Sequence, residues 1–290
     1  MTGVYGIIQF LVAPAWDQFY LNQNDLLFLG KPTPLGIRVF STMGQSVTFG
    51  ANLMPGLLLL LISKEKWRFT AAGCGYLVFL LSQARTPWYT FILAVLFFVF
   101  SLKGSHQIRA IITVTLVALL IIPLTTIEPF SEKIIARIET FDNLENDGSY
   151  QTRTKQFENS INYALSQSIG YGLISPGQAP TQENAASKKN LFSVNDNGYL
   201  ALFVSLGWFG TIIYLVGLIS LFLKVFQVSI HFNDTFLVCA RAIALASLLR
   251  LFTANVTTGP YAMPIWGFLG IAIAGYKYYL TQYISANRGS

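Results

Sequence analysis

The sequence predicts an all-α integral membrane protein: a multi-span helical bundle with one long, partly helical loop on its outer side. The first observation behind this prediction is composition. Of the 290 residues, 53% are hydrophobic and 11% are charged, and the mean hydropathy is +0.52, whereas a soluble domain carries about 25% charged residues. The second observation is that the apolar residues form runs of roughly 20, the length at which a helix crosses about 30 Å of hydrocarbon.

Apolar length and the flanking polar residues divide the chain into three parts. N-terminal transmembrane helices occupy residues 1–126, an outer loop occupies 127–197, and C-terminal transmembrane helices occupy 198–290. A short apolar stretch, Met1–Ala15, comes first; it is either a half-length insertion or the end of a helix whose beginning is missing. The full spans predicted after it are 45–63, 67–84, 87–103, 108–126, 198–223, 236–254 and 259–280.

Lysine and arginine in the short connections predict the orientation, because cytoplasmic loops of membrane proteins are enriched in these residues. With seven spans from residue 45 onward, four basic clusters fall on one face, which is therefore expected to be cytoplasmic. The clusters are Lys64, Lys66 and Arg68; Lys103 and Arg109; Lys224; and Lys277 with Arg288. The outer face then receives the connections 16–44, 85–87, 127–197 and 255–259.

The outer loop is the only long polar segment, and it holds nine of the 13 acidic residues. Residues 131–144 and 152–172 each place their apolar residues on one stripe, as an amphipathic helix does, and glycines 170 and 172 end the second of these segments. The stripes are Ile134, Ile138 and Phe141 in the first segment and Phe157, Ile161 and Leu165 in the second.

Several functions lack the residues that they need. The net charge of +6 is divided among short loops, without the basic stripe and interleaved aromatics of a nucleic-acid-binding protein. Cys74 and Cys239 both lie in apolar spans, so we expect neither a disulfide framework nor a cysteine metal site. His106 and His231 lie far apart in polar connections and are expected to be solvated.

Ionisable residues at the ends of spans carry the functional information, because burying a charge in lipid costs several kcal/mol. Taken singly, each has an ordinary structural explanation. An arginine at a span end can extend to headgroup phosphates, which suits Arg241 best because it is closer to the cytoplasmic side. Asp196, just before the 198–223 span, could be a helix N-cap.

Taken together, five of these residues suggest a site. They come from separate segments and all fall on the predicted outer face: Arg38, Arg85, Arg153, Arg250 and Asp196. Arginine binds phosphate oxygens in bidentate geometry and keeps its charge, so converging arginines suit a pyrophosphate on a lipid carrier. A carboxylate beside them can act as general base toward an attacking hydroxyl. No acidic pair or histidine cluster on that face suits a divalent metal, so the arginines would stabilise the leaving diphosphate by themselves.

Five segments follow one another along the chain: YGIIQFLVAPAWDQFY (5–20), GIRVFSTMGQSVTFGANLMPGLLLL (36–60), LSQARTPWYTFILAV (81–95), DGSYQTRTKQFENSINYALSQSIGYGLISPG (147–177) and VNDNGYLALFVSLGWFGTIIYLV (194–216). In this order they resemble the O-antigen ligase and polysaccharide polymerase family, membrane glycosyltransferases of the GT-C type.

The resemblance implies transfer of a glycan from an undecaprenyl-diphosphate donor to a hydroxyl acceptor, on the outer side of the bacterial cytoplasmic (inner) membrane. It also implies inversion of the anomeric centre, no metal and no cofactor. The partners would be the lipid-linked oligosaccharide, a growing glycan or lipid acceptor, and the membrane. By motif, the arginines of the family that contact the diphosphate match Arg153, Arg85 and Arg38.

The sequence departs from the ligases of this family at the position of the base. Ligases carry a histidine just before the span that follows the long loop, whereas this chain has Asn195, Asp196 and Asn197 there. Polymerase-like members resemble it in having an aspartate before Gly-Tyr-Leu. We therefore expect Asp196 to be the base, and a polymerase rather than a lipid-A-core ligase.

Two alternatives remain open from the sequence. One is a transporter or flippase of lipid-linked sugar, although transporters tend to carry polar residues near the bilayer midplane and broken helices in matching halves. The other is an inactive, truncated member of the family, because family members usually have several spans before the segment that begins here at Met1.

Overall fold

The computed structural model describes residues 1–24, 26–121, 198–229, 234–252 and 259–288. It also describes isolated residues between them: Glu128, Ser131, Ile135, Thr154, Glu158, Ile161, Ser168, Ile169, Gly170 and Gly172. Five of these, Ser131, Ile135, Thr154, Glu158 and Ile161, have helical backbone. The two loop helices predicted from the sequence otherwise lie outside the described residues.

The described parts are helical and contain no strand beyond one isolated bridge between Gly30 and Ile37, which confirms the all-α class. The helices are α1 (Thr2–Val12), α2 (Ala15–Gln23), η1 (Leu27–Leu29), α3 (Ser46–Ile62), α4 (Arg68–Leu81), α5 (Arg85–Ser101), α6 (Ser105–Ile121), α10 (Gly198–Ser229), α11 (Thr235–Leu249), η4 (Arg250–Phe252), η5 (Gly259–Tyr261) and α12 (Ala262–Arg288).

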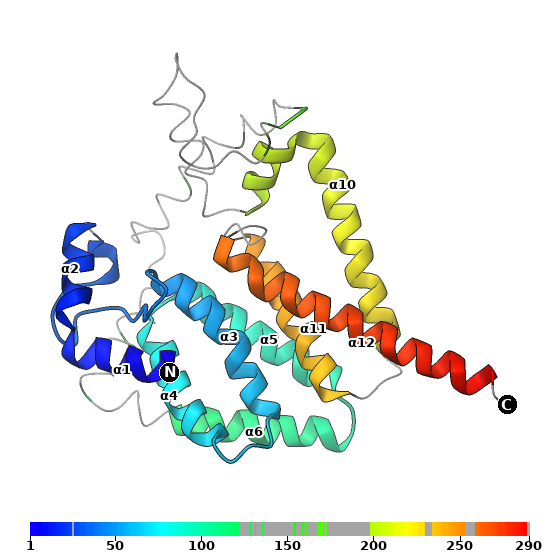
Figure 1. Cartoon of the computed structure of the whole chain (residues 1–290), viewed down its shortest axis with the longest axis horizontal. Helices are drawn as coiled ribbons and strands as arrows, with labels where there is room; N and C mark the ends of the chain where they lie inside the picture. The colour runs from blue at the N-terminus through cyan, green and yellow to red at the C-terminus, as the bar shows by residue number, and fades with distance from the viewer. Residues whose placement is uncertain are drawn as a thin grey trace.

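Helix α11 forms the centre of the bundle, packed against α12, α5 and α3 (Figure 1). Its sequence TFLVCARAIALASLL is rich in alanine, and small side chains let neighbouring backbones approach closely. The largest core cluster accordingly joins α11 residues such as Ile243 to Met54 of α3 and Phe98 of α5. Arg241 is only 7% exposed in this central helix. The expectation that it reaches the headgroups is therefore wrong, because other helices cover the helix that carries it.

Two helices are long and apolar enough to cross a membrane, over residues 198–225 and 235–252. Helices α3, α4 and α5 are apolar but have 17 residues or fewer, and 17 residues rise only about 26 Å. Their positions agree with the predicted spans 45–63, 67–84 and 87–103 to within a few residues. That all seven predicted spans cross the bilayer stays a prediction.

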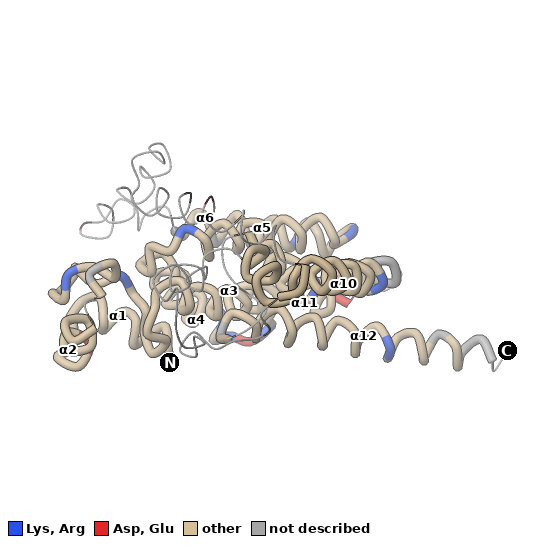
Figure 2. The backbone as a smooth tube through the Cα atoms, turned by 90° about the horizontal axis from the view of Figure 1, so that it is seen from above, with Lys and Arg blue, Asp and Glu red and all other residues tan. Residues whose placement is uncertain are grey.

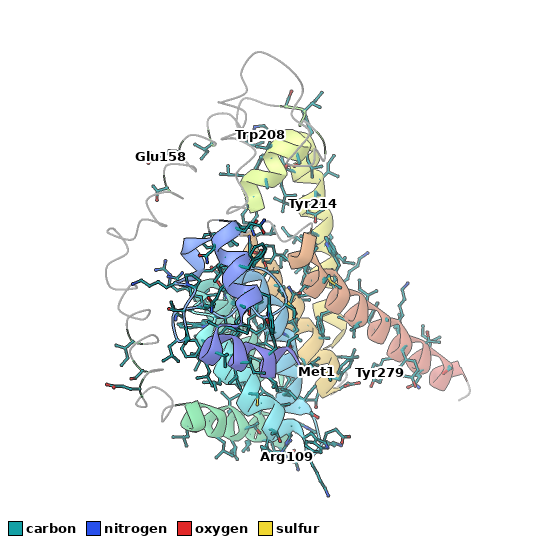
Figure 3. The ribbon with its side chains drawn as sticks, turned by 60° about the vertical axis from the view of Figure 1, so that its left-hand side comes forward. Met1, Arg109, Glu158, Trp208, Tyr214 and Tyr279 are labelled. Carbon is teal, nitrogen blue, oxygen red and sulfur yellow. The ribbon has the colours of Figure 1, made fainter. Side chains whose placement is uncertain are left out.

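The bundle has two distinct ends, because its helices α3, α4, α5, α11 and α12 alternate in direction (Figure 1). The arginine end holds the starts of α3 and α5, the end of α4, and the turns η4 and η5. The opposite end holds the connections α3–α4 and α5–α6 and the start of α11. Figure 3 shows Trp208 and Arg109 at these two ends respectively, and Figure 2 shows that lysines and arginines lie mostly at helix ends or in connections.

Residues 1–45 fold against the arginine end, where the sequence predicted only a connection for residues 16–44. The side-chain oxygen of Gln9 accepts hydrogen bonds from the backbone N–H groups of Phe40 (3.0 Å) and Ser41 (2.8 Å). The hydroxyl of Tyr5 donates to Asp17 of α2 at 2.7 Å. Because these bonds join α1 to both α2 and the irregular chain before α3, the segment is an integral part of the fold.

Helix α10 is broken at Gly207, where the sequence predicted one continuous span over 198–223. Gly207 has φ 68° and ψ −174°, a conformation open almost only to glycine. Residues 198–206, here called the half-helix, lead up to a sharp bend, after which the remainder of α10 runs beside α12 (Figure 1). The break frees the carbonyl of Ser205, which accepts a hydrogen bond from the N–H of Gly172 at 2.9 Å.

Candidate functional site

Three of the five predicted site residues lie in the described chain, and all three are at the arginine end. Arg38 follows the bridge between Gly30 and Ile37 and is half-buried. Arg85 is the first residue of α5 and is also half-buried. Arg250 begins η4 and is 3% exposed. Arg153 and Asp196 lie outside the described residues.

The segments of Arg38 and Arg85 are joined through the end of α4. The N–H of Val39 donates to the carbonyl of Leu81 at 3.1 Å. After Leu81 the chain makes a tight turn, with Gln83 at φ 50°, before α5 begins. Helix α3 packs closely against the start of α5, since a Cβ added to Gly50 would lie 2.8 Å from the Cβ of Pro87.

Arg250 is held from the other side of the same end by an aromatic ring. Its guanidinium carbon lies 5.0 Å from the centre of the Tyr261 ring in η5, within the range of a cation–π interaction. The hydroxyl of Tyr261 accepts a hydrogen bond from Thr48 in the first turn of α3 at 2.9 Å. The contacts therefore run without interruption from Arg250 to the helix that packs beside Arg85.

Two helices begin at this end without a side-chain cap. The residues before α3 and α5, Gln45 and Ala84, form no capping bond, and neither helix has an acidic residue in its first turn. The first N–H groups of a helix have no partner inside it and carry partial positive charge. Arg85 adds a full positive charge at the start of α5, which is the unfavourable sign for that helix dipole unless an anion is present.

The half-helix packs directly onto the turn that carries Arg250. The ring of Tyr199 lies 4.8 Å from the ring of Phe252, measured between centroids, and Leu202 packs with Leu251. On its other side, Leu200 packs against Ile161, a member of the apolar stripe predicted for residues 152–172.

Glycines fix the half-helix in this place. A Cβ on Gly170 would clash with the backbone carbonyl of Ser205, so the end of the loop and the bend of α10 touch backbone to backbone. Gly172 is at φ 78°, where glycine is favoured. This contact and the bond from Gly172 to Ser205 tie the end of the loop to the bend that ends the half-helix.

Sequence reasoning missed the polar residues that support the site. Thr48 and Tyr261 are uncharged and lie close to predicted span boundaries, so nothing distinguishes them from interfacial residues. Thr211 and Tyr214, separated by three positions on α10, have buried side-chain oxygens without a hydrogen-bond partner among the described residues. The signal that could have found Tyr261 is its place in the sequence GPYAMP, a turn on the same predicted face as Arg250.

The described side chains at the arginine end suit recognition of a polyanion. Three guanidiniums and two uncapped helix starts share one end of the bundle. Over the described residues, no group of three histidine, cysteine, aspartate or glutamate side chains could hold a metal ion. A ligand that carries two phosphates would complement both the charges and the helix dipoles.

Comparison with protein families shows what the chain is similar to. A family model described as O-antigen ligase matches residues 69–215, just over half of the chain. Arg85, Arg153 and Asp196 fall within the matched residues, and Arg38 and Arg250 fall outside them. Comparisons with curated proteins and with solved structures gave no match.

Proposed function

We propose that this chain, which belongs to the O-antigen ligase family, transfers or polymerises glycan repeat units from an undecaprenyl-diphosphate-linked donor. The acceptor is a hydroxyl group, and the reaction takes place on the outer face of the bacterial inner membrane. Family membership confirms the resemblance seen in the sequence and supports glycan transfer in general. The donor lipid, the acceptor and the side of the membrane belong to the proposal.

The observation that carries the proposal is the packing of the half-helix on the arginine end. Asp196 is three residues before Tyr199, and three residues of chain extend at most about 11 Å. Tyr199 packs on Phe252, two residues after Arg250, and we propose that this short connection lets Asp196 reach the site of this arginine. Ile161 packs on the same half-helix and follows Arg153 in the chain by eight positions.

The proposed chemistry is an inverting displacement at the anomeric carbon of the donor sugar. Asp196 accepts the proton of the acceptor hydroxyl while the acceptor oxygen bonds to the anomeric carbon. The bond from that carbon to the phosphate oxygen breaks, and the electron pair leaves with the lipid diphosphate. The arginines Arg38, Arg85, Arg153 and Arg250 stabilise the negative charge that develops on this leaving group, without a metal ion.

The residues around the base favour a polymerase over a lipid-A-core ligase. By the resemblance described above, the chain has Asp196 where ligases of the family carry histidine, and it is similar to polymerase-like members in having an aspartate before Gly-Tyr-Leu. We therefore propose that the acceptor is the sugar of another lipid-linked repeat unit or of a growing chain.

One observation supports transport of a lipid-linked sugar as a second candidate. Discontinuous helices are common at the substrate sites of transporters, and α10 is discontinuous at Gly207. The two functions differ in where unpolymerised lipid-linked units accumulate when the gene is deleted. Accumulation in the inner leaflet would support transport, and accumulation in the outer leaflet would support polymerisation.

The experiment that tests the proposal is complementation of a deletion strain, read as the chain length of the surface glycan. Asp196→Asn and Arg153→Ala should abolish long chains at normal protein level, because the first removes the base and the second a diphosphate contact. Asn195→Ala is the matched control for the same segment and should restore long chains. Unchanged long-chain polymer in the Asp196→Asn strain would overturn the proposed roles.

A further inference from the structure

We infer that Tyr261 is a positioning residue for Arg250, and that Thr48 fixes Tyr261 by a hydrogen bond across the bundle. This inference rests on the proposed function, since it assigns the two residues to the binding of the lipid diphosphate. Both lie outside residues 69–215, so the match to the family gives them no role.

Arg250 lies in a buried and largely apolar environment. Its side chain is 3% exposed and lies at the end of α11, beside the apolar cluster formed by Leu251, Leu202 and their neighbours. A guanidinium in such a place needs a partner for its charge. The face of the Tyr261 ring lies 5.0 Å from the guanidinium carbon and attracts this cation through the negative face of the ring quadrupole.

A hydrogen bond from Thr48 holds the ring of Tyr261 in place. Tyr261 is the last residue of the short turn η5, and a tyrosine on a short turn would keep rotational freedom. Thr48 removes this freedom through its 2.9 Å hydrogen bond to the tyrosine hydroxyl. Thr48 itself is 6% exposed in the first turn of α3, a helix held against α5 by the contact of Gly50 with Pro87.

A ring held in place can order Arg250 before the diphosphate binds. An arginine side chain loses rotamer entropy when it is ordered. If the ring orders Arg250 before the ligand arrives, that loss does not reduce the affinity for the ligand. These contacts also fix the position of Arg250, at the start of η4, relative to Arg85, at the start of α5, because both segments contact the first turns of α3. Tyr261 and Thr48 thus serve to place two cations for one diphosphate.

The test measures binding of undecaprenyl diphosphate to the purified full-length chain in lipid nanodiscs, with undecaprenyl monophosphate as the second probe. Tyr261→Leu removes the ring and should weaken diphosphate binding about tenfold, which is about 1.4 kcal/mol. Binding of undecaprenyl monophosphate should weaken less, because a single phosphate contacts fewer of the arginines and depends less on their relative positions. Arg250→Ala should weaken diphosphate binding by at least as much.

The bond between Thr48 and Tyr261 is tested by a double-mutant cycle that keeps the ring. Tyr261→Phe and Thr48→Val each remove the same hydrogen bond, so each should weaken diphosphate binding by about two- to fivefold. The double variant should be no weaker than either single variant, and Thr48→Ser should bind as the wild type does. This cycle decides the question even if Tyr261→Leu fails to fold.

The outcomes separate the inference from the proposed function. If Arg250→Ala weakens diphosphate binding but Tyr261→Leu, or the cycle, leaves it unchanged, the inference is wrong and the function of Arg250 stands. If Arg250→Ala has no effect while Arg85→Ala does, both the inference and the role of Arg250 are wrong. If no arginine variant affects binding of either probe, the diphosphate site itself is wrong.

Discussion

The start of α5 and the start of α11 lie at opposite ends of the bundle and are stabilised in opposite ways. Helix α11 is capped by Asp234, whose carboxylate accepts hydrogen bonds from Phe236 N–H (2.8 Å) and Leu237 N–H (3.4 Å). The hydroxyl of Tyr279 in α12 donates to the same carboxylate at 2.8 Å. Helix α5 instead begins after Ala84, with no side-chain cap and with Arg85 as its first residue.

The difference is one between these helix starts and not between the whole ends, because α4 also begins at the opposite end without a side-chain cap and with Arg68 as its first residue. A carboxylate cap satisfies helix N–H groups and the dipole permanently. We propose that at the starts of α3 and α5 an anion from outside satisfies the same groups, and that without it these uncapped helix starts are less stable. This reading agrees with the general trade-off between stability and function at binding sites, and it can be tested by changing each end separately.

Among changes at the two ends of the bundle, the largest effect is expected where the arginine end depends on the bend of α10. Gly207→Ala should lower the free energy of unfolding by about 2–3 kcal/mol, because φ 68° disfavours a side chain and the new Cβ would clash with the backbone at Gly170 and Ser168. Thermal unfolding in detergent checks this. Gly217→Ala, on the same helix with nothing within 4 Å of the added Cβ, is the control and should be neutral or slightly stabilising.

The second-largest effect is expected at the opposite end of the bundle, where α11 begins. Asp234→Ala removes both the cap of α11 and the partner of Tyr279, and should lower the free energy of unfolding by about 1–2 kcal/mol. Glycan transfer per folded molecule should stay close to that of the wild type, because this end holds none of the proposed site. Tyr279→Phe, which keeps the cap, should lose about half as much stability. Loss of transfer in either variant at normal protein level would contradict the separation of the two ends.

A smaller effect of opposite sign is expected from capping the arginine end. Gln45 precedes α3 in extended conformation (φ −145°, ψ 138°) and is exposed, so Gln45→Asp can cap the helix and raise stability by about 0.5–1 kcal/mol. The added carboxylate should also weaken binding of undecaprenyl diphosphate by competing for the same N–H groups. Gln45→Ser caps the helix without adding a charge and should weaken binding less. Equal binding by the wild type, Gln45→Asp and Gln45→Ser would contradict the proposal that the start of α3 takes part in binding the diphosphate.

The smallest effect is expected on the outward surface of α10. Ile213 is 72% exposed in the isolated chain and lies in a span apolar enough for lipid. Ile213→Ala should change the free energy of unfolding by less than about 0.5 kcal/mol. The thermal unfolding temperature should therefore change little. Ile243→Ala in α11, where the side chain is fully buried, is the matched contrast and should cost about 2–5 kcal/mol.

The sequence predicted the helices better than the joints between them. Apolar run length located α3, α4, α5, α11 and α12 to within a few residues at most of their termini, because burial in a bundle or in lipid needs long uniform segments. The bend at Gly207 could not be predicted, since Gly210 and Gly217 lie in the same run. What singles out Gly207 is its contact with Gly170, a residue 37 positions earlier.

The candidate site divides in the same way. Charge alone selected Arg38, Arg85 and Arg250, and the structure places all three at one end. Thr48 and Tyr261 are 213 positions apart in the sequence. Both are uncharged, so the search for ionisable residues at span ends could not select them. Such a pair becomes visible only when α3 and η5 are placed side by side. The roles of Arg153 and Asp196 stay predictions, because both lie outside the described residues.

The most direct test of the account is the pH dependence of glycan transfer by Asp196→His, compared with that of the wild type. A general base must be deprotonated, so transfer is lost as the pH falls through the pKa of the base. Carboxylates titrate near pH 4 and imidazoles near pH 6.5, roughly. The account predicts that the variant keeps part of the activity and loses it at a pH about 2 units higher than the wild type does. The same acid limit in both proteins would contradict the central claim that Asp196 takes the proton of the acceptor.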